Sequence, residues 1–130
     1  MRLLIMVVFF HFGCSQKILP HLAAFWTNIT LPHTEECIAE SSMDPLAVVD
    51  LFHNVPVDDS RALRCFFKCL SAKLNMLLPN GEFDVHKYYK VAPDFEKHII
   101  EGCVDGHLDE TDICDKAFVI AFCIMQVAIE

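Results

Sequence analysis

Cysteines are the residues of this chain with the widest choice of chemistry, because a thiol can form a disulfide, bind a metal or act as a nucleophile. Cys14 lies near the N-terminus, and the other six are Cys37, Cys65, Cys69, Cys103, Cys114 and Cys123. No further Cys or His cluster completes a tetrahedral metal site around Cys65 and Cys69, so a metal is not expected. An even set of six in a secreted chain instead predicts three disulfides.

The N-terminal segment predicts that the chain is secreted. A positive charge at Arg2 precedes an apolar run over residues 3–12, and small residues stand before Gln16. This is the pattern of a signal peptide, and the run is shorter than the ~18 apolar residues that a transmembrane helix needs. We therefore expect a signal peptide over residues 1–15, which includes Cys14, and one extracellular domain over residues 16–130.

Composition excludes two classes of protein. The chain has 130 residues, of which 54% are hydrophobic, and this content is too high for a disordered protein. It carries 18 acidic and 10 basic side chains, a formal net charge of −8. Nucleic-acid binding requires a basic surface, so no nucleic acid is expected as a partner.

The secretory route would expose one sequon to glycosylation. Asn28-Ile29-Thr30 has the required Asn-x-Thr form. Asn28 is therefore a candidate glycosylation site.

The pattern of apolar residues predicts an all-α fold, since strand-like alternation is scarce and only four glycines occur. Pro32 is expected to end the first helix, and Pro79-Asn80-Gly81 to form a turn. The helices are expected over residues 17–31, 33–42, 44–52, 58–78, 84–90, 93 to about 102–106, and 111–127.

The expected helix over residues 58–78 has two apolar faces, so it should be largely enclosed by other elements. One face carries the bulky residues Leu63, Phe66, Phe67, Leu70, Leu74 and Leu77. The opposite face carries Cys65, Cys69, Ala72 and Met76.

The spacing of the cysteines excludes short-range disulfides. Cys65 and Cys69 share one helix face, whereas Cys114 and Cys123 lie on opposite faces of the last helix. Each cysteine should therefore bond to a different element, and several pairings satisfy this condition.

These features together resemble the insect odorant-binding protein family, of the pheromone-binding and general odorant-binding type. The intervals between the six cysteines are 27, 3, 33, 10 and 8 residues. The likeness spans residues 33–126. Four segments are also similar to family motifs, namely Met43-Asp44-Pro45-Leu46, Arg64-Cys65-Phe66-Phe67-Lys68-Cys69-Leu70, Asn80-Gly81-Glu82-Phe83-Asp84 and Asp112-Ile113-Cys114-Asp115-Lys116-Ala117.

The resemblance implies a six-helix bundle, stapled by disulfides, around a closed hydrophobic cavity. It implies the pairs Cys37–Cys69, Cys65–Cys114 and Cys103–Cys123. It also implies a secreted, non-catalytic carrier of small hydrophobic ligands such as odorants or pheromones, without a cofactor. A membrane chemoreceptor or a second copy of the chain are further candidate partners.

Large apolar side chains are the candidates for the cavity wall, although each could equally be plain core. A tyrosine would supply a polar contact. The expected ligand-binding residues are Phe52, Phe66, Phe67, Leu70, Leu74, Leu77, Tyr88, Tyr89, Phe118, Phe122 and Met125. The apolar C-terminal residues 124–130 suit either closure of the pocket or homodimerisation.

Other functions receive less support from the sequence. The long helix has no histidine, so it lacks the residue that a secreted phospholipase A2 needs there, and no Gly-x-Ser-x-Gly motif occurs. His53, His86, His98 and His107 could sense pH, but ordinary solvated histidines are the simpler expectation. The alternative function is that of a gland, seminal or salivary protein on the same scaffold, which acts through protein interaction or ligand sequestration.

Overall fold

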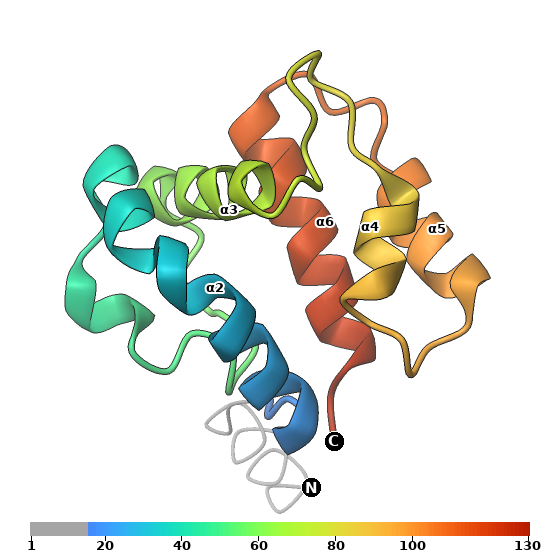
Figure 1. Ribbon diagram of the computed structural model, residues 1–130, viewed down its shortest axis with the longest axis horizontal. Coiled ribbons are helices and arrows are strands. Elements are labelled where there is room, and N and C mark those ends of the chain that lie inside the picture. Colours follow the sequence, from blue (N-terminus) through green and yellow to red (C-terminus); the bar gives the residue numbers. More distant parts are fainter. Residues whose placement is uncertain (1–15) are drawn as a thin grey trace, which may run out of the picture.

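The computed structural model describes residues 16–130, so the predicted signal peptide lies outside the described residues (Figure 1). The all-α prediction is confirmed, and this part of the chain has five α-helices and one 3-10 helix where a six-helix bundle was expected. They are α2 (Pro20–Ser41), the 3-10 helix η1 (Pro45–Val48), α3 (Arg61–Lys73), α4 (Val85–Lys90), α5 (Lys97–Asp105) and α6 (Ile113–Val127). None of these described helices is both long and apolar enough to cross a membrane.

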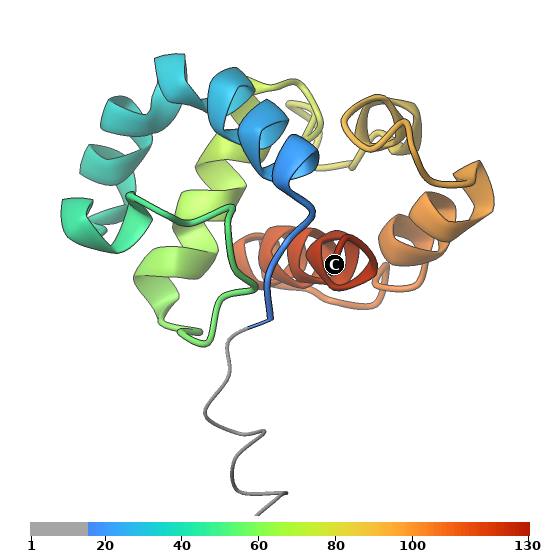
Figure 2. The ribbon, with the colours of Figure 1, turned by 90° about the horizontal axis from the view of Figure 1, so that it is seen from below.

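Helices α3 and α6 cross at the centre of the bundle. Helix α2 and η1 lie on one side of this pair, and α4 and α5 lie on the other (Figure 1). The view from below shows that α2 runs along the outside of the bundle (Figure 2). The central pair can therefore present apolar side chains to both layers. The second apolar face expected for α3 is only partly covered, because Ala72 is exposed.

Short polar side chains set the starts of the helices, as their capping preference predicts. Asp44 accepts a hydrogen bond from the Leu46 amide at the start of η1. Ser60 accepts one from the Leu63 amide at the start of α3, and Asp112 accepts one from Asp115 at the start of α6.

The prediction that Pro32 ends the first helix is wrong. Helix α2 continues through Pro32 to Ser41, so the two expected helices are one. A proline removes one hydrogen bond and crowds the preceding turn. Tertiary anchors on either side of Pro32 offset this cost, because Trp26 and Cys37 are both buried.

The expected helix over residues 58–78 is also too long. Helix α3 ends at Lys73, and Asn75 adopts a left-handed conformation with φ 62°. This reversal takes Met76 and Leu77 out of the helical register. Their predicted faces were therefore wrong, although both side chains are buried.

Two further helices are shorter than expected. The segment from Asp44 to Phe52 forms only the 3-10 turn η1, and the branched Val48 and Val49 do not favour its extension into an α-helix. Helix α5 begins at Lys97 rather than Pro93, because the chain first forms a turn.

Backbone hydrogen bonds connect the N-terminal segment to two distant parts of the chain. The Ile18 amide donates to the His53 carbonyl (2.9 Å), and the Leu19 amide donates to the Ala128 carbonyl (2.9 Å). Ile18 also forms an isolated β-bridge with Ile129. We call this arrangement the terminal ladder. It fixes the C-terminal residues against residues 17–19.

Candidate ligand-binding cavity

A largely apolar cavity of about 60 Å³ lies between α2, α3, α4 and α6. These four helices contribute to its wall, together with four residues from the segments that connect helices. The wall consists of Trp26, Ile29, Thr30, Phe52, Phe67, Leu70, Ser71, Leu74, Met76, Tyr88, Val91, Ala121, Ile124 and Met125. Pockets for drug-sized ligands have volumes of ~300–1,000 Å³, so a guest of that size can enter this cavity only if wall side chains move. Met76 and Met125 are suited to such movement, because methionine is unbranched and adapts its shape.

Six of the eleven predicted ligand-binding residues line the cavity. They are Phe52, Phe67, Leu70, Leu74, Tyr88 and Met125. Two of them, Phe67 and Leu70, come from α3, and Leu74 directly follows the end of that helix at Lys73.

The other five predicted residues lie outside the cavity wall. Phe66 is buried behind Phe67, and Leu77 pairs with Phe83 after the end of α3. Phe118 and Phe122 stack on each other at a centroid distance of 5.8 Å, and Phe118 packs behind the wall residue Phe67 at 5.9 Å without lining the cavity. Tyr89 is half-buried and does not line the cavity, whereas its neighbour Tyr88 does.

Several wall residues were not predicted. Trp26, Ile29 and Thr30 belong to α2, a segment for which the sequence predicted a helix but no role in binding. The position of Met76 depends on the backbone reversal at Asn75, for which the sequence carries no clear signal. Ser71 could have been recognised from the sequence as a polar contact in the cavity wall, since it is a polar residue in a helix that is expected to be enclosed.

Aromatic rings form a connected series along the wall. Phe52 meets Trp26 edge-on at a centroid distance of 6.1 Å and meets Phe67 at 6.2 Å. The Trp26 indole N–H donates to the Val91 carbonyl (2.6 Å), which attaches α2 to the end of α4. Edge-on packing and this hydrogen bond hold the bulky part of the wall in one arrangement.

The polar groups of the wall are hydroxyls. Ser71 Oγ and Tyr88 Oη lie 3.1 Å apart, and both side chains are buried. Thr30 Oγ1 donates to the Trp26 carbonyl (2.8 Å) within α2. Burial raises the pKa of the Tyr88 phenol, and the hydrogen bond with Ser71 opposes that shift without cancelling it. The phenol is therefore neutral at physiological pH.

The Ser71–Tyr88 pair has one hydrogen-bond donor to spare. Each hydroxyl supplies one proton, and the contact between the two oxygens uses one of the two protons. The remaining donor can reach an acceptor on a guest. The wall carries no Asp, Glu, Lys or Arg, so it matches a neutral, mostly apolar molecule with one acceptor group.

Three disulfides connect the helices around the cavity. Cys37–Cys69 joins α2 to α3, Cys65–Cys114 joins α3 to α6, and Cys103–Cys123 joins α5 to α6. These are the pairs that the family resemblance implies. Helix α4 has no disulfide, and the contacts of Tyr88 and Val91 described above attach it to the other helices of the wall.

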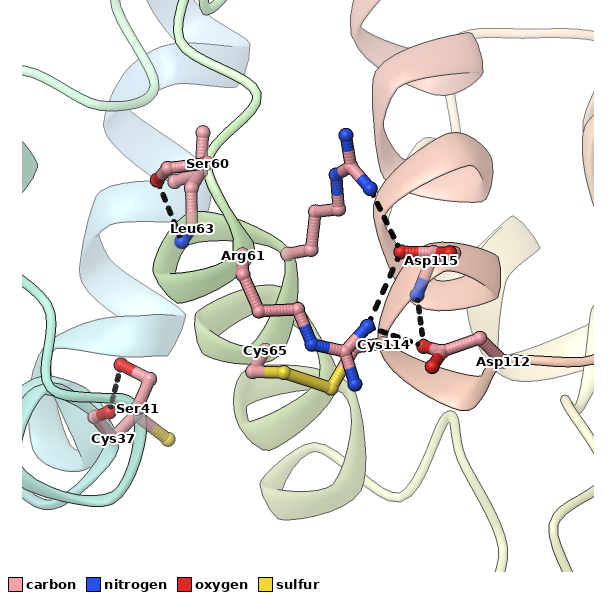
Figure 3. The surroundings of a disulfide bond; sticks show 10 residues. Cys37, Ser41, Ser60, Arg61, Leu63, Cys65, Asp112, Cys114 and Asp115 are labelled. Atoms are coloured by element: carbon pink, nitrogen blue, oxygen red, sulfur yellow. Dashed lines mark hydrogen bonds and ion pairs between the residues drawn. A yellow bond between two sulfur atoms is a disulfide. The ribbon is translucent and has the colours of Figure 1, made fainter.

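An ion-pair cluster surrounds Cys65–Cys114 outside the cavity (Figure 3). Arg61 Nη1 lies 2.8 Å from Asp112 Oδ1, and Arg64 Nη1 lies 3.0 Å from Asp115 Oδ1. The hydrogen bond from Arg61 lowers the pKa of Asp112 to about 2, helped by the Asp115 amide. Across residues 16–130 no group of three or more His, Cys, Asp or Glu side chains is placed to hold a metal ion.

Comparisons with known proteins agree with this geometry. The model of the PBP/GOBP family matches residues 27–127. General odorant-binding protein 57c of Drosophila melanogaster is 28% identical over 102 residues, which cover 72% of this chain and 68% of that protein. General odorant-binding protein 57d of the same species is 29% identical over 130 residues, with 86% and 92% covered. No solved structure matches the chain. The six cysteines, their three helix-joining bridges and the match over residues 27–127 place the chain in the PBP/GOBP family.

Proposed function

We propose that the protein is a secreted, non-catalytic carrier that holds small, neutral, hydrophobic molecules such as odorants or pheromones in this cavity. The observation that carries the proposal is the cavity wall, which is apolar apart from hydroxyl groups and contains no Asp, Glu, Lys or Arg. Family membership supports the general carrier role, and the names of both Drosophila relatives describe odorant binding.

Burial of apolar surface supplies the affinity in this proposal. Each Å² of ligand surface removed from water contributes about 25 cal/mol, and losses of rigid-body freedom offset part of the total. The spare donor of the Ser71–Tyr88 pair adds selectivity for a guest with a carbonyl, ester or hydroxyl oxygen.

Uptake of a fluorescent naphthylamine probe tests the carrier role. We expect the oxidised protein to take up the probe and apolar volatiles to displace it. Ala121→Leu should abolish uptake, because the added carbons fill the cavity. Ala72→Leu is the matched control, since Ala72 is an exposed residue of α3 outside the wall.

Two results would overturn the proposal. One is a folded wild-type protein that takes up no probe, which would favour the alternative role in protein interaction. The other is equal uptake by the Ala121→Leu and Ala72→Leu variants, which would place binding elsewhere on the molecule.

A further inference from the structure

The outer face of α2 exposes apolar side chains between His21, which pairs with Asp94, and Glu35. Asp, Glu, Lys and Arg are all absent from residues 18–34. Leu31 is 66% exposed and Phe25 is 39% exposed, and Ala24 and Pro32 are also exposed. We refer to Ala24, Phe25, Leu31 and Pro32 together as the α2 outer face.

Asn28 lies at the centre of this face. With ~100° of rotation per residue, Asn28 is within about 60° of each of the four side chains around the helix axis. Its own side chain is exposed and belongs to the sequon Asn28-Ile29-Thr30. The buried residues Trp26, Thr30 and Cys37 lie on the opposite side of α2.

We propose that Asn28 carries an N-linked glycan, and that this glycan covers the α2 outer face. The first sugars of a glycan on Asn28 would stand directly over Phe25 and Leu31, which are the large exposed apolar side chains of this face. The glycan would point away from the cavity, because α2 presents its other side to the ligand wall.

A second copy of the chain fits this face less well. A stable interface buries ~800 Å² and about 20–30 residues on each partner, far more than one strip of a single helix supplies. Such an interface would also bury the Asn28 amides at its centre, and burial of an unpaired amide is costly. A glycan removes both difficulties, since it is attached covalently and remains hydrated.

The chemistry requires a lipid-linked oligosaccharide as the donor. A bond forms between Nδ2 of Asn28 and C1 of the first sugar. The bond from C1 to the diphosphate oxygen of the carrier lipid breaks, the diphosphate leaves with the electron pair, and the amide loses one proton. No oxidant or reductant takes part.

Transfer must precede the folding of α2. In the helix, Asn28 and Thr30 point in nearly opposite directions, and the Thr30 hydroxyl is buried and donates to the Trp26 carbonyl. The sequon can present its amide and hydroxyl together only while this segment is extended. The folded, oxidised protein should therefore be a poor acceptor.

Mass analysis of the secreted protein tests the modification. The full chain with its own leader should be expressed in insect cells, and the intact mass measured before and after treatment with a peptide N-glycosidase. We expect a glycan mass on the wild type that the enzyme removes, with Asn28 converted to Asp in the corresponding peptide. Asn28→Gln and Thr30→Val should lack the glycan, whereas Thr30→Ser should retain it because serine keeps the sequon. A secreted wild-type protein at the bare polypeptide mass would overturn the proposal.

Retention on a hydrophobic-interaction column tests the covering role. Leu31→Glu should shorten the retention of the unglycosylated Asn28→Gln variant but leave that of the glycosylated wild type nearly unchanged, because the glycan already covers Leu31. An equal shift with and without the glycan would overturn the covering role. Probe uptake by the Asn28→Gln variant reports on the carrier role separately, so failure of either proposal is distinguishable from failure of the other.

Discussion

At the scale of single residues, the proposed carrier role assigns selectivity to two hydroxyl groups in an otherwise apolar wall. Ser71 and Tyr88 satisfy each other when no guest is present, so neither group is left without a partner in the empty cavity. A guest with an oxygen acceptor gains a hydrogen bond from the spare donor. A hydrocarbon gains nothing from the pair but does not break it.

Tyr88→Phe should therefore weaken the binding of ligands with a carbonyl or hydroxyl group by about 2- to 10-fold, since a hydrogen bond contributes ~0.5–1.5 kcal/mol net. Affinity for a hydrocarbon of equal size should not fall, because Ser71 can satisfy its hydroxyl within α3. Competition with the naphthylamine probe measures both affinities, and Tyr89→Phe serves as the matched control outside the wall. Equal losses for both ligands would contradict the assigned role.

Asp112 makes stability depend on pH in the acid range. Arg61 and the Asp115 amide lower its pKa from 3.8 to about 2 in the folded protein. A lowered pKa stabilises the fold while the carboxylate is ionised, above about pH 4. This contribution is lost as the pH falls from about 4 to 2, where the folded state must also take up the proton.

The variant Asp112→Asn should flatten the dependence of the melting temperature on pH between pH 4 and pH 2. Asp44→Asn is the matched control, because Asp44 also caps a helix but pairs with no arginine in the described chain. Identical slopes for wild type and Asp112→Asn would refute the assignment.

At the scale of elements, tertiary anchoring decides where helices end. Helix α2 passes through Pro32 because Trp26 and Cys37 fix it on both sides. Helix α3 stops at Lys73 although apolar spacing continues, because the chain reverses at Asn75. Local propensity alone favours the opposite outcome in both places.

Replacement of Pro32 by Ala should stabilise the protein by about 1–3 kcal/mol, because alanine restores the helical hydrogen bond and removes the clash. Greater freedom of the unfolded chain offsets part of this gain. Urea unfolding with the disulfides intact measures the change. Pro45→Ala is the control, since a proline in the first turn of a helix costs little stability. A fall in stability for Pro32→Ala would show that the fold needs the missing hydrogen bond at Pro32.

At the scale of the whole molecule, disulfides and backbone hydrogen bonds stabilise different parts of the cavity. The disulfides join α2, α3, α6 and α5 in series. The terminal ladder holds residues 17–19 and the C-terminal residues next to His53, which directly follows the wall residue Phe52. The N-terminal segment thus stabilises one side of the cavity without lining it.

Ile18→Ala tests this role, because Ile18 is 3% exposed and lies at the centre of the ladder. We expect a loss of about 2–5 kcal/mol in the free energy of unfolding, as for other buried isoleucines, and weaker probe uptake. Lys17→Ala changes an exposed neighbour and should alter stability by less than about 0.5 kcal/mol. Equal stabilities for the two variants would show that the ladder contributes nothing.

Helix content, most helix starts and the disulfide-rich character could be read from the sequence. Capping residues such as Asp44, Ser60 and Asp112 act on amides two or three positions away, so their effect is local and visible in sequence. The position of the cavity wall was only half predictable. Phe67 and Leu70 follow from helical spacing, whereas Trp26 and Met76 depend on how distant elements meet.

The sequence by itself determined the fold class and the means of stapling it: an all-α chain in which six of the seven cysteines have the family spacing. Only the tertiary structure decided which side chains enclose the cavity, since side-chain direction depends on helix ends that packing sets. It placed the Ser71 and Tyr88 hydroxyls together from residues seventeen positions apart. It also left Asn28 on an exposed face, because α2 buries the opposite side against the ligand wall.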